Sequence, residues 1–192
     1  MQAGNLVNHP PRFSGNPDDF PIFDTKFRCF VLGLDLWGFF DGSEKLPEEV
    51  EPAEEWEARR AFAAAWLLQG LTAEALRLVS GLDDPKAIRD LLCQTYAPRT
   101  VHALLKLEAE LFSRKLKPGE SVPSVVEWFE RKFYNFEYIC ETPFPEVFKV
   151  GLLYNSLRDN PQVNVAHALI CSSSLDNLVW DSVANRILQQ YK

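Results

Sequence analysis

The sequence predicts an all-α protein made of two helical lobes. Of its 192 residues, 46% are hydrophobic and 12% are aromatic, which is enough apolar surface to build well-packed cores. Apolar side chains recur at intervals of three and four residues along most of the chain, as they do on one face of a helix. We find neither a segment of alternating polarity, which would predict a strand, nor an internal repeat.

The chain begins with an arm and a first core helix. Proline, glycine and asparagine are frequent in "NHPPRFSGNP", so residues 1–14 are expected to form an extended N-terminal arm. Asp18 or Asp19 can start a helix of about four turns. The residues of this helix that repeat at helical spacing and should face the core are Phe20, Phe23, Phe27, Phe30, Val31 and Leu34.

Three further helices are predicted in the first half of the chain. The loop that starts at Asp41 contains eight acidic residues before Ala58 but only one basic residue, Lys45, and we interpret it as a solvated loop and helix start. A helix begins near Ala53 and continues to Leu71. The other two are expected at Thr72–Val79 and Asp84–Tyr96.

The segment "YAPRT", residues 96–100, is the predicted boundary between the lobes. It contains a proline, and the charge balance changes there: the formal charge is −7 before residue 98 and zero after it. We therefore expect an N-terminal lobe at 15–97 and a C-terminal lobe at 98–192. The helices predicted in the second lobe are Thr100–Leu116, Ser121–Cys140, Pro143–Leu157, Val163–Cys171 and Asn177–Tyr191.

Composition excludes several classes of protein. Nucleic-acid binding depends on Lys and Arg, so a chain with a net charge of −7 is not expected to be a primary RNA or DNA binder. There is no apolar leader and no apolar run long enough to span a membrane, which predicts a soluble cytoplasmic protein. The four cysteines are far apart, without a C-x-x-C pair, and we expect reduced, buried thiols at Cys29, Cys93, Cys140 and Cys171.

No motif predicts catalysis. The three histidines, His9, His102 and His167, have no ligand or catalytic partner at a useful spacing, and neither a G-x-S-x-G elbow nor a phosphate-binding loop occurs. We predict no enzyme activity, no cofactor and no metal. Glu108 is expected to be half-buried among apolar residues, which would require a partner, most simply a structural ion pair.

The stretch "KPGESVPSVVEWFERKF", residues 117–133, combines a turn with a strongly amphipathic helix. Gly119 lets the chain reverse tightly, and the Glu120 carboxylate can hold nearby backbone or an arginine. Ser121 can cap the helix, or Ser124 can form a capping box with Glu127. The stripe expected to face the core consists of Val122, Val125, Val126, Phe129, Phe133, Phe136 and Cys140.

This region carries a resemblance to a known family. The run "LLKLEAELFSRKLKPGESVPSVVEWFERKF" resembles the Gag capsid of LTR retrotransposons, in which a Gly-Glu-Ser-Val turn corresponds to the major homology region of retroviral capsids. Upstream, "PPRFSGNPDDFPIFDTKFRCFV" is similar to the Phe-x-Gly opening of these domains, and "VFKVGLLYNSLRDNPQVNVAHAL" resembles their later helices. Val125, Trp128 and the lack of a tryptophan in "DPKAIRDLLCQTY" depart from the family pattern, so copia-type and gypsy-type ancestry both stay open.

The resemblance implies a non-enzymatic, two-lobed retroviral-capsid-like protein that self-assembles into particles enclosing RNA. The zinc knuckle that binds RNA in this family is not in the sequence, so RNA contact would need a downstream segment. The lock at the major-homology-like turn would consist of Gly119, Glu120, Ser121, Val122, Val126 and Phe129. In the retroviral relatives the next helix forms a two-fold contact, for which Phe148 and Leu152 are the candidates, although the pair would equally suit an internal contact.

Two other functions are kept open. A domesticated relative, as in the Arc-type capsids, could bind a host peptide without forming particles, in an aromatic groove lined by Phe20, Phe23, Trp37 or Trp66. A hydrolase would require His102 or His167 to lie beside a carboxylate and a Ser or Cys.

Overall fold

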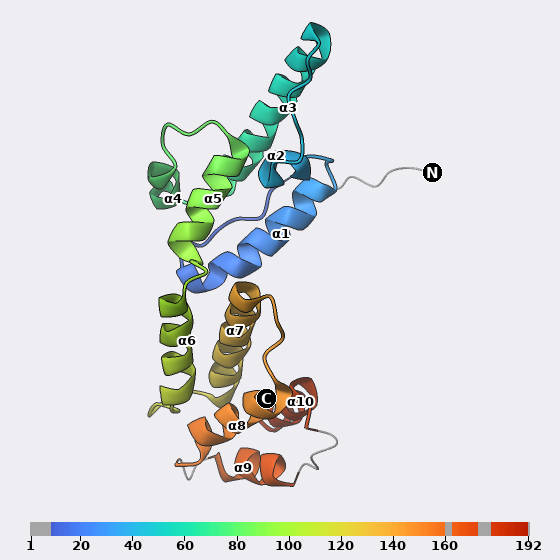
Figure 1. Ribbon diagram of the computed structural model, residues 1–192. Coiled ribbons are helices and arrows are strands. Elements are labelled where there is room, and N and C mark those ends of the chain that lie inside the picture. The colour runs from blue at the N-terminus through green and yellow to red at the C-terminus, as the bar shows by residue number, and fades with distance from the viewer. Residues whose placement is uncertain (1–8, 160–162, 173–177, 192) are drawn as a thin grey trace, which may run out of the picture. The chain divides into compact units, whose positions relative to one another are not determined.

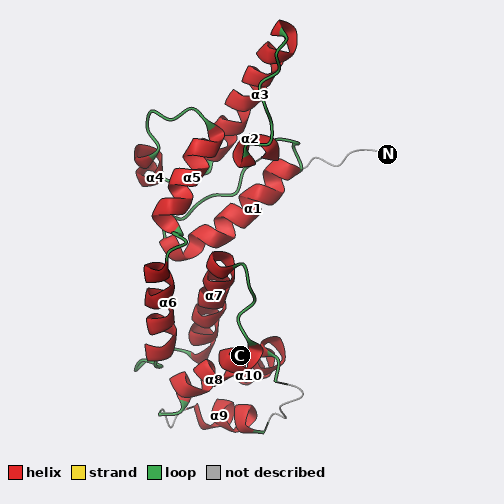
Figure 2. Ribbon diagram, viewed as in Figure 1, coloured by secondary structure: helices red, strands yellow, loops and turns green. Residues whose placement is uncertain are grey.

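The computed structural model describes residues 9–159, 163–172 and 178–191, and their regular structure is helical throughout (Figures 1 and 2). Within these ranges no strand occurs, which confirms the all-α prediction. The chain divides into two compact units, Met1–Pro98 and Arg99–Lys192, which we call the N-terminal and the C-terminal unit. No helix in the described ranges combines the length and the apolar character needed to cross a lipid bilayer.

Two of the α-helices in the N-terminal unit start at residues whose polar side chains cap them. Thr72 accepts a hydrogen bond from the backbone N–H of Ala75, and Asp84 accepts one from that of Ala87, at 3.3 and 2.8 Å. The short helix α2 was not predicted from the sequence. The elements are η1 Pro17–Asp19, α1 Phe20–Leu32, α2 Trp37–Asp41, α3 Val50–Gln69, α4 Ala73–Leu78 and α5 Pro85–Tyr96.

Phenylalanine dominates the core of the N-terminal unit. Phe13, in the extended segment that precedes η1, is only 3% exposed, and its backbone N–H donates to the carbonyl of Gly70 at 2.8 Å. Its ring meets those of Phe20 and Tyr96 edge to face, with centroids 5.4 and 4.7 Å apart. The end of the predicted arm is therefore part of the core.

A buried ion pair joins α1 to α5. The Arg89 guanidinium donates to both carboxylate oxygens of Asp24, at 2.9 and 2.7 Å, and the Asp24 side chain is 6% exposed. The same guanidinium lies 4.9 Å from the ring centroid of Trp37, as does that of Arg28. The indole of α2 is thus held by cations from both α1 and α5.

The C-terminal unit is built around α7. Five members of its predicted stripe are buried, Phe129 completely, whereas Phe136 and Cys140 are half-exposed. Figure 1 shows α6 beside α7. The helices α8, α9 and α10 gather at the end of the unit where α6 ends and α7 begins. The helices of this unit are α6 Val101–Ser113, α7 Val122–Cys140, α8 Glu146–Leu157, α9 Asn164–Cys171 and α10 Trp180–Gln190.

Glu146, at the start of α8, connects three elements of the C-terminal unit. Its carboxylate accepts a hydrogen bond from the backbone N–H of Trp180 at 2.6 Å, and it forms a 3.0 Å ion pair with Lys149. Lys149 also pairs with Glu137 of α7 at 3.0 Å. Partial burial raises the pKa of Glu146, but these hydrogen bonds outweigh burial and leave its pKa below the ordinary value.

Replacing Phe129 by alanine should unfold the C-terminal unit or come close to it. The side chain is fully buried, and its ring centroid lies 5.6 Å from that of Phe133 and 5.1 Å from that of Trp128. Phe129→Ala is expected to cost about 3 to 5 kcal/mol in denaturant unfolding of dilute protein, because it leaves a cavity as well as removing apolar burial. Phe112→Ala is the control. Because Phe112 is 57% exposed, its removal should lower the free energy of unfolding only slightly. Equal losses for the two variants would contradict the assigned core.

Candidate functional site

The turn between α6 and α7 contains the residues predicted to form a lock. Gly119 has a φ of 79°, and no atom lies within 4 Å of where a Cβ would sit. Glycine is therefore required there by the backbone conformation rather than by lack of space. Ser121 begins α7: its hydroxyl oxygen accepts from the backbone N–H of Ser124 at 3.2 Å, so Ser121 is the cap.

Glu120 holds this turn together. One carboxylate oxygen accepts from the backbone N–H of Lys117 at 3.0 Å, and the other accepts from the Arg114 guanidinium. Arg114 also donates to the carbonyl of Lys115 at 2.7 Å and lies 5.1 Å from the ring centroid of Trp128 on α7. Partial burial raises the pKa of Glu120, but the hydrogen bonds from Arg114 and Lys117 outweigh it and hold the pKa below its ordinary value.

The same turn is fastened to the end of α8. The backbone N–H of Leu116 donates to the carbonyl of Ser156 at 3.0 Å. The Lys115 ammonium donates to the carbonyl of Asn155 at 2.6 Å and to the carboxylate of Asp159 at 3.1 Å. The turn therefore joins α6, α7 and α8.

The apolar members of the predicted lock lie on α7, just after the turn, and face the core. Val122, Val126 and Phe129 are 3%, 0% and 0% exposed and belong to one core cluster with side chains of α6, α8, α9 and α10. The six residues thus fall into two groups: Gly119, Glu120 and Ser121 shape the turn and the helix start, and the other three anchor α7.

A shallow cleft of about 540 Å³ lies beside the turn. The Trp128 indole on its wall is contacted by two cations, since Lys132 also approaches the ring centroid at 5.5 Å and pairs with Glu110 at 2.6 Å. Acidic and basic groups both line the cleft. Arg114 and Glu120 pair with each other, whereas Glu110 and Lys115 pair with residues outside the lining. The cleft is lined by Glu110, Ser113, Arg114, Lys115, Lys117, Glu120 and Trp128.

The structure corrects the prediction that Phe148 and Leu152 form a common patch on α8. Phe148 is 58% exposed, but Leu152 is only 5% exposed and belongs to the core. Val147 lies at helical spacing with the buried Val150, Leu153 and Leu157, but it is 58% exposed beside Phe148. Gly151 is exposed on the same side, one turn after Val147, and nothing in the described chain lies within 4 Å of a Cβ added there. We call Val147, Phe148 and Gly151 the α8 surface.

The four residues predicted to line an aromatic groove do not form one exposed surface, although Phe23 contributes to the wall of a cleft of about 440 Å³. Phe20 and Phe23 are 1% and 4% exposed in the core of the N-terminal unit, and Trp37 is enclosed by the two arginines described above. Trp66 lies elsewhere, with its ring centroid 5.2 Å from that of Phe30 and 5.4 Å from that of Phe62. Core aromatics and surface aromatics follow the same helical spacing, so their sequence pattern alone could not separate them.

Other predicted site residues are placed as follows. The expectation of buried thiols was wrong for Cys29 and Cys171, which are exposed, whereas Cys93 and Cys140 are half-exposed. His9 and His102 are exposed, and the side chain of His167 lies outside the described residues. Glu108 is half-buried as expected, but among the described residues it makes no ion pair. A search of these residues finds no group of three His, Cys, Asp or Glu side chains suited to a metal ion.

Comparison of the chain with protein-family models, with curated proteins and with solved structures finds no match.

Glu120→Gln should lower the free energy of unfolding by about 1 to 3 kcal/mol at neutral pH, because it removes the charge that Arg114 and the turn recognise. A lowered pKa in the folded state stabilises the protein above the ordinary carboxyl value of 4.5, and this contribution is lost as the pH falls below it. The stability gap between wild type and variant should therefore narrow in acid. Thermal unfolding from pH 7 to pH 3 measures it.

Glu127→Gln on the exposed face of α7 is the matched control and should leave stability unchanged. If Glu120→Gln unfolds at the wild-type temperature at pH 7, the carboxylate does not stabilise the turn.

Proposed function

We propose that this protein is a non-enzymatic capsid-type protein of the LTR-retrotransposon Gag kind, whose copies assemble into shells. The observation that carries the proposal is the α8 surface, an exposed apolar face on the second helix after the major-homology-like turn. The resemblance of residues 104–133 to Gag capsids supports it, because the next helix forms a two-fold contact in the retroviral relatives. The residues of the contact differ from the expected ones, since Leu152 is buried.

Gly151 is the strongest sign that α8 meets another molecule. A glycine inside a helix costs about 0.5 to 1 kcal/mol relative to alanine. Apart from its chain neighbours and the backbone of its own helix, no described atom lies within 4 Å of its missing Cβ, so the fold gains no packing from it. A second helix can approach the backbone closely at such a position, and the flanking Val147 and Phe148 would then be covered.

The geometry suits a contact between two copies of α8 related by a two-fold axis. The helices would cross at Gly151, and Phe148 of one copy would pack beside Val147 of the other. Both copies would then bury the same surface. Such a contact explains all three exposed residues together.

The N-terminal unit supports a second candidate function. Phe62 is 52% exposed beside Trp66 and Phe30, and this cluster could hold an apolar segment of a host protein in a domesticated relative that forms no particles. Chains that stay monomeric at high concentration would favour this candidate.

Val147→Asp combined with Phe148→Asp should give a folded monomer, because both side chains are 58% exposed and their charges would meet across the two-fold axis. Sedimentation velocity of dilute protein should show no dimers, and electron microscopy at rising protein and salt concentrations should show no shells. Val165→Asp on α9, where the side chain is 52% exposed, is the control and should assemble as wild type does.

Gly151→Leu separates association from folding. It should remove the dimer by blocking the crossing point, while the unfolding temperature stays the same or rises. Dimers that persist in both α8 variants would contradict the proposed contact.

Residues 1–192 alone should bind RNA weakly and without sequence preference at physiological salt, because their net charge is −7. Fluorescence anisotropy with labelled RNAs of different sequence measures this, and binding below about 1 μM would contradict it. RNA enclosure is therefore assigned to a basic segment outside this sequence.

A further inference from the structure

A cleft of the N-terminal unit lies between the extended segment before η1 and helix α1. Its volume is about 440 Å³, and its apolar walls consist of Pro11 from the extended segment and of Ile22 and Phe23 from α1. Phe23 is only 4% exposed, whereas Pro11 and Ile22 are half-buried. The cleft therefore has an apolar interior that belongs to the fold and an open side that faces solvent.

Arg12 and Lys26 give this cleft a basic rim. Both side chains are exposed, and within the described residues neither of them forms an ion pair. The acidic group of the rim, Asp19, already accepts a hydrogen bond from the Ser14 hydroxyl at 2.7 Å. Two cations that no described carboxylate neutralises, placed beside apolar walls, favour a ligand that combines an apolar side chain with carboxylates.

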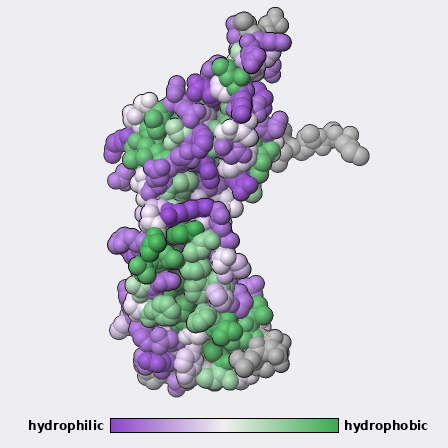
Figure 3. Space-filling model, viewed as in Figure 1, coloured by the Kyte–Doolittle hydropathy of each residue, from purple (hydrophilic) through white to green (hydrophobic). Residues whose placement is uncertain are grey.

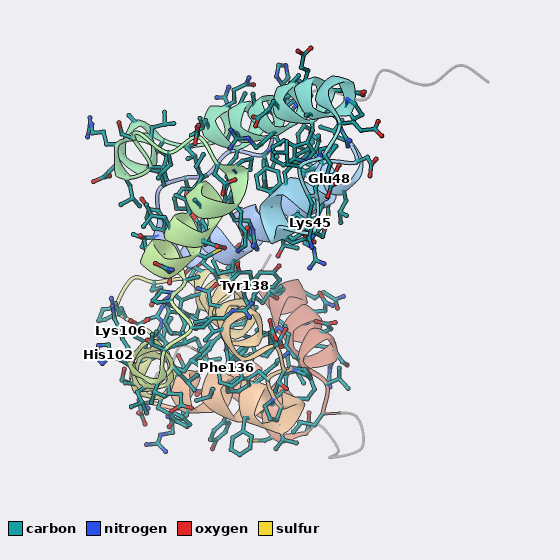
Figure 4. All side chains as sticks on the ribbon, turned by 45° about the horizontal axis from the view of Figure 1, so that its top comes forward. Lys45, Glu48, His102, Lys106, Phe136 and Tyr138 are labelled. Atoms are coloured by element: carbon teal, nitrogen blue, oxygen red, sulfur yellow. The ribbon has the colours of Figure 1, made fainter. Side chains whose placement is uncertain are left out.

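The loop before α3 carries this combination of groups. Leu46 is 56% exposed, and the exposed carboxylates Glu48 and Glu49 follow it and form no ion pair among the described residues. Figure 4 shows Glu48 together with Lys45, the cation that precedes Leu46. We call residues 45–49 the acidic loop.

The acidic loop belongs to a projection of the N-terminal unit. Figure 1 shows that the start of α3 and the loop before it extend beyond α1, α2, α4 and α5. The surface of this projection is mainly hydrophilic, as Figure 3 shows. An exposed leucine on such a projection is placed to enter a cleft of another molecule.

The acidic loop does not reach the cleft of its own copy. The loop ends where α3 begins, whereas the cleft lies near the other end of α3, at Gly70. A Cβ added to Gly70 would lie 2.5 Å from the carbonyl oxygen of Pro11, which lines the cleft. Because α3 has 20 residues, its two ends are about 30 Å apart. A contact between loop and cleft therefore requires two copies.

A similar loop precedes α5, but its acids are engaged within their own copy. Leu82 is 37% exposed and is followed by Asp83 and Asp84. These two carboxylates lie 3.7 and 3.9 Å from the Arg60 guanidinium, and Asp84 also caps α5. The acidic loop is thus the better ligand for the basic rim.

We propose that the acidic loop of one copy docks in this cleft of a second copy. The Leu46 side chain fills the apolar part of the cleft, and Glu48 and Glu49 meet the two cations of its rim. The contact joins two different surfaces, so each copy in an open row leaves one loop and one cleft available for the next. Rows that close become rings.

The contact is weak between two free chains, because one leucine enters the cleft and ion pairs at an exposed rim add little. It becomes effective when many copies combine it with a second contact. In the assembly proposed above it would connect one α8 dimer to the next, a step that rests on the proposed function.

The Val147→Asp, Phe148→Asp background measures the contact without the α8 surface. In sedimentation velocity at high protein concentration, residues 1–192 with these two changes should self-associate reversibly. The association should weaken as the salt concentration rises, because the ion pairs at the rim are screened. Leu46→Lys should abolish it, whereas Leu82→Lys, the matched control, should leave it unchanged. A background that stays monomeric, or association that survives Leu46→Lys, overturns the proposal and leaves the α8 contact untouched.

Charge reversal identifies the cleft. In the same background, Arg12→Glu combined with Lys26→Glu should abolish the association, and adding Glu48→Lys with Glu49→Lys should restore it. A loss that the second pair of changes does not reverse would show that the acidic loop does not bind at this rim. Leu46→Lys alters the other half of the contact in a projecting loop, so it decides the question even if the cleft variant loses stability.

Mixing two variants tests whether loop and cleft meet each other. The cleft variant with Arg12→Glu and Lys26→Glu retains an intact loop, and the Leu46→Lys variant retains an intact cleft. Each should be monomeric alone in the α8 background, and the mixture should form pairs of one copy of each variant but no longer rows. A mixture that stays monomeric would overturn the loop-to-cleft contact.

Discussion

The pairing of the Glu120 carboxylate with Arg114 closes the turn through which α6, α7 and α8 of the C-terminal unit are joined. The backbone of this turn requires a glycine at residue 119, and the same turn is bonded to the last residues of α8. Without the carboxylate, the largely buried Arg114 side chain would lose its charged partner, which is costly in a protein interior. The positions of α6, α7 and α8, and hence the faces that α6 and α8 turn to solvent, all follow from this turn.

Both units use the same combination of groups. In the N-terminal unit a carboxylate holds an arginine that lies against an indole, namely Asp24, Arg89 and Trp37. In the C-terminal unit the corresponding groups are Glu120, Arg114 and Trp128. In each case the carboxylate fixes the guanidinium by directed hydrogen bonds, and the aromatic face stabilises the remaining charge. Charged side chains can therefore fasten these helices together without being left unpaired in the interior.

The sequence predicted most helices because apolar residues recur at helical spacing, and some of their starts are also marked by capping residues, as at Thr72, Asp84 and Ser121. It also predicted the turn at Glu120, since glycine and an acidic residue have local reasons to occur there. The short helix α2 was missed because it is a single turn, too short for a periodic pattern to show. Cys29 lies on the face of α1 opposite Phe27 and Val31, so the helical period itself should have predicted its exposure.

The surface of α8 could not be predicted in the same way. Apolar spacing along a helix predicts one buried stripe. However, α8 contacts α6, α7, α9 and α10, so its buried face is wider and also includes Leu152 and Ser156. Which side chains remain exposed then depends on neighbours that are distant in the sequence.

The hydrogen bond from Trp180 to Glu146 has a consequence for how the chain folds. Val179, at the position that precedes α10, provides no side-chain cap, and the first turn of α10 is instead capped by a carboxylate 34 residues earlier. This bond cannot form until α8 has its start in place and the intervening chain has closed into a loop. The beginning of α10 is thus specified by tertiary structure as well as by its own sequence.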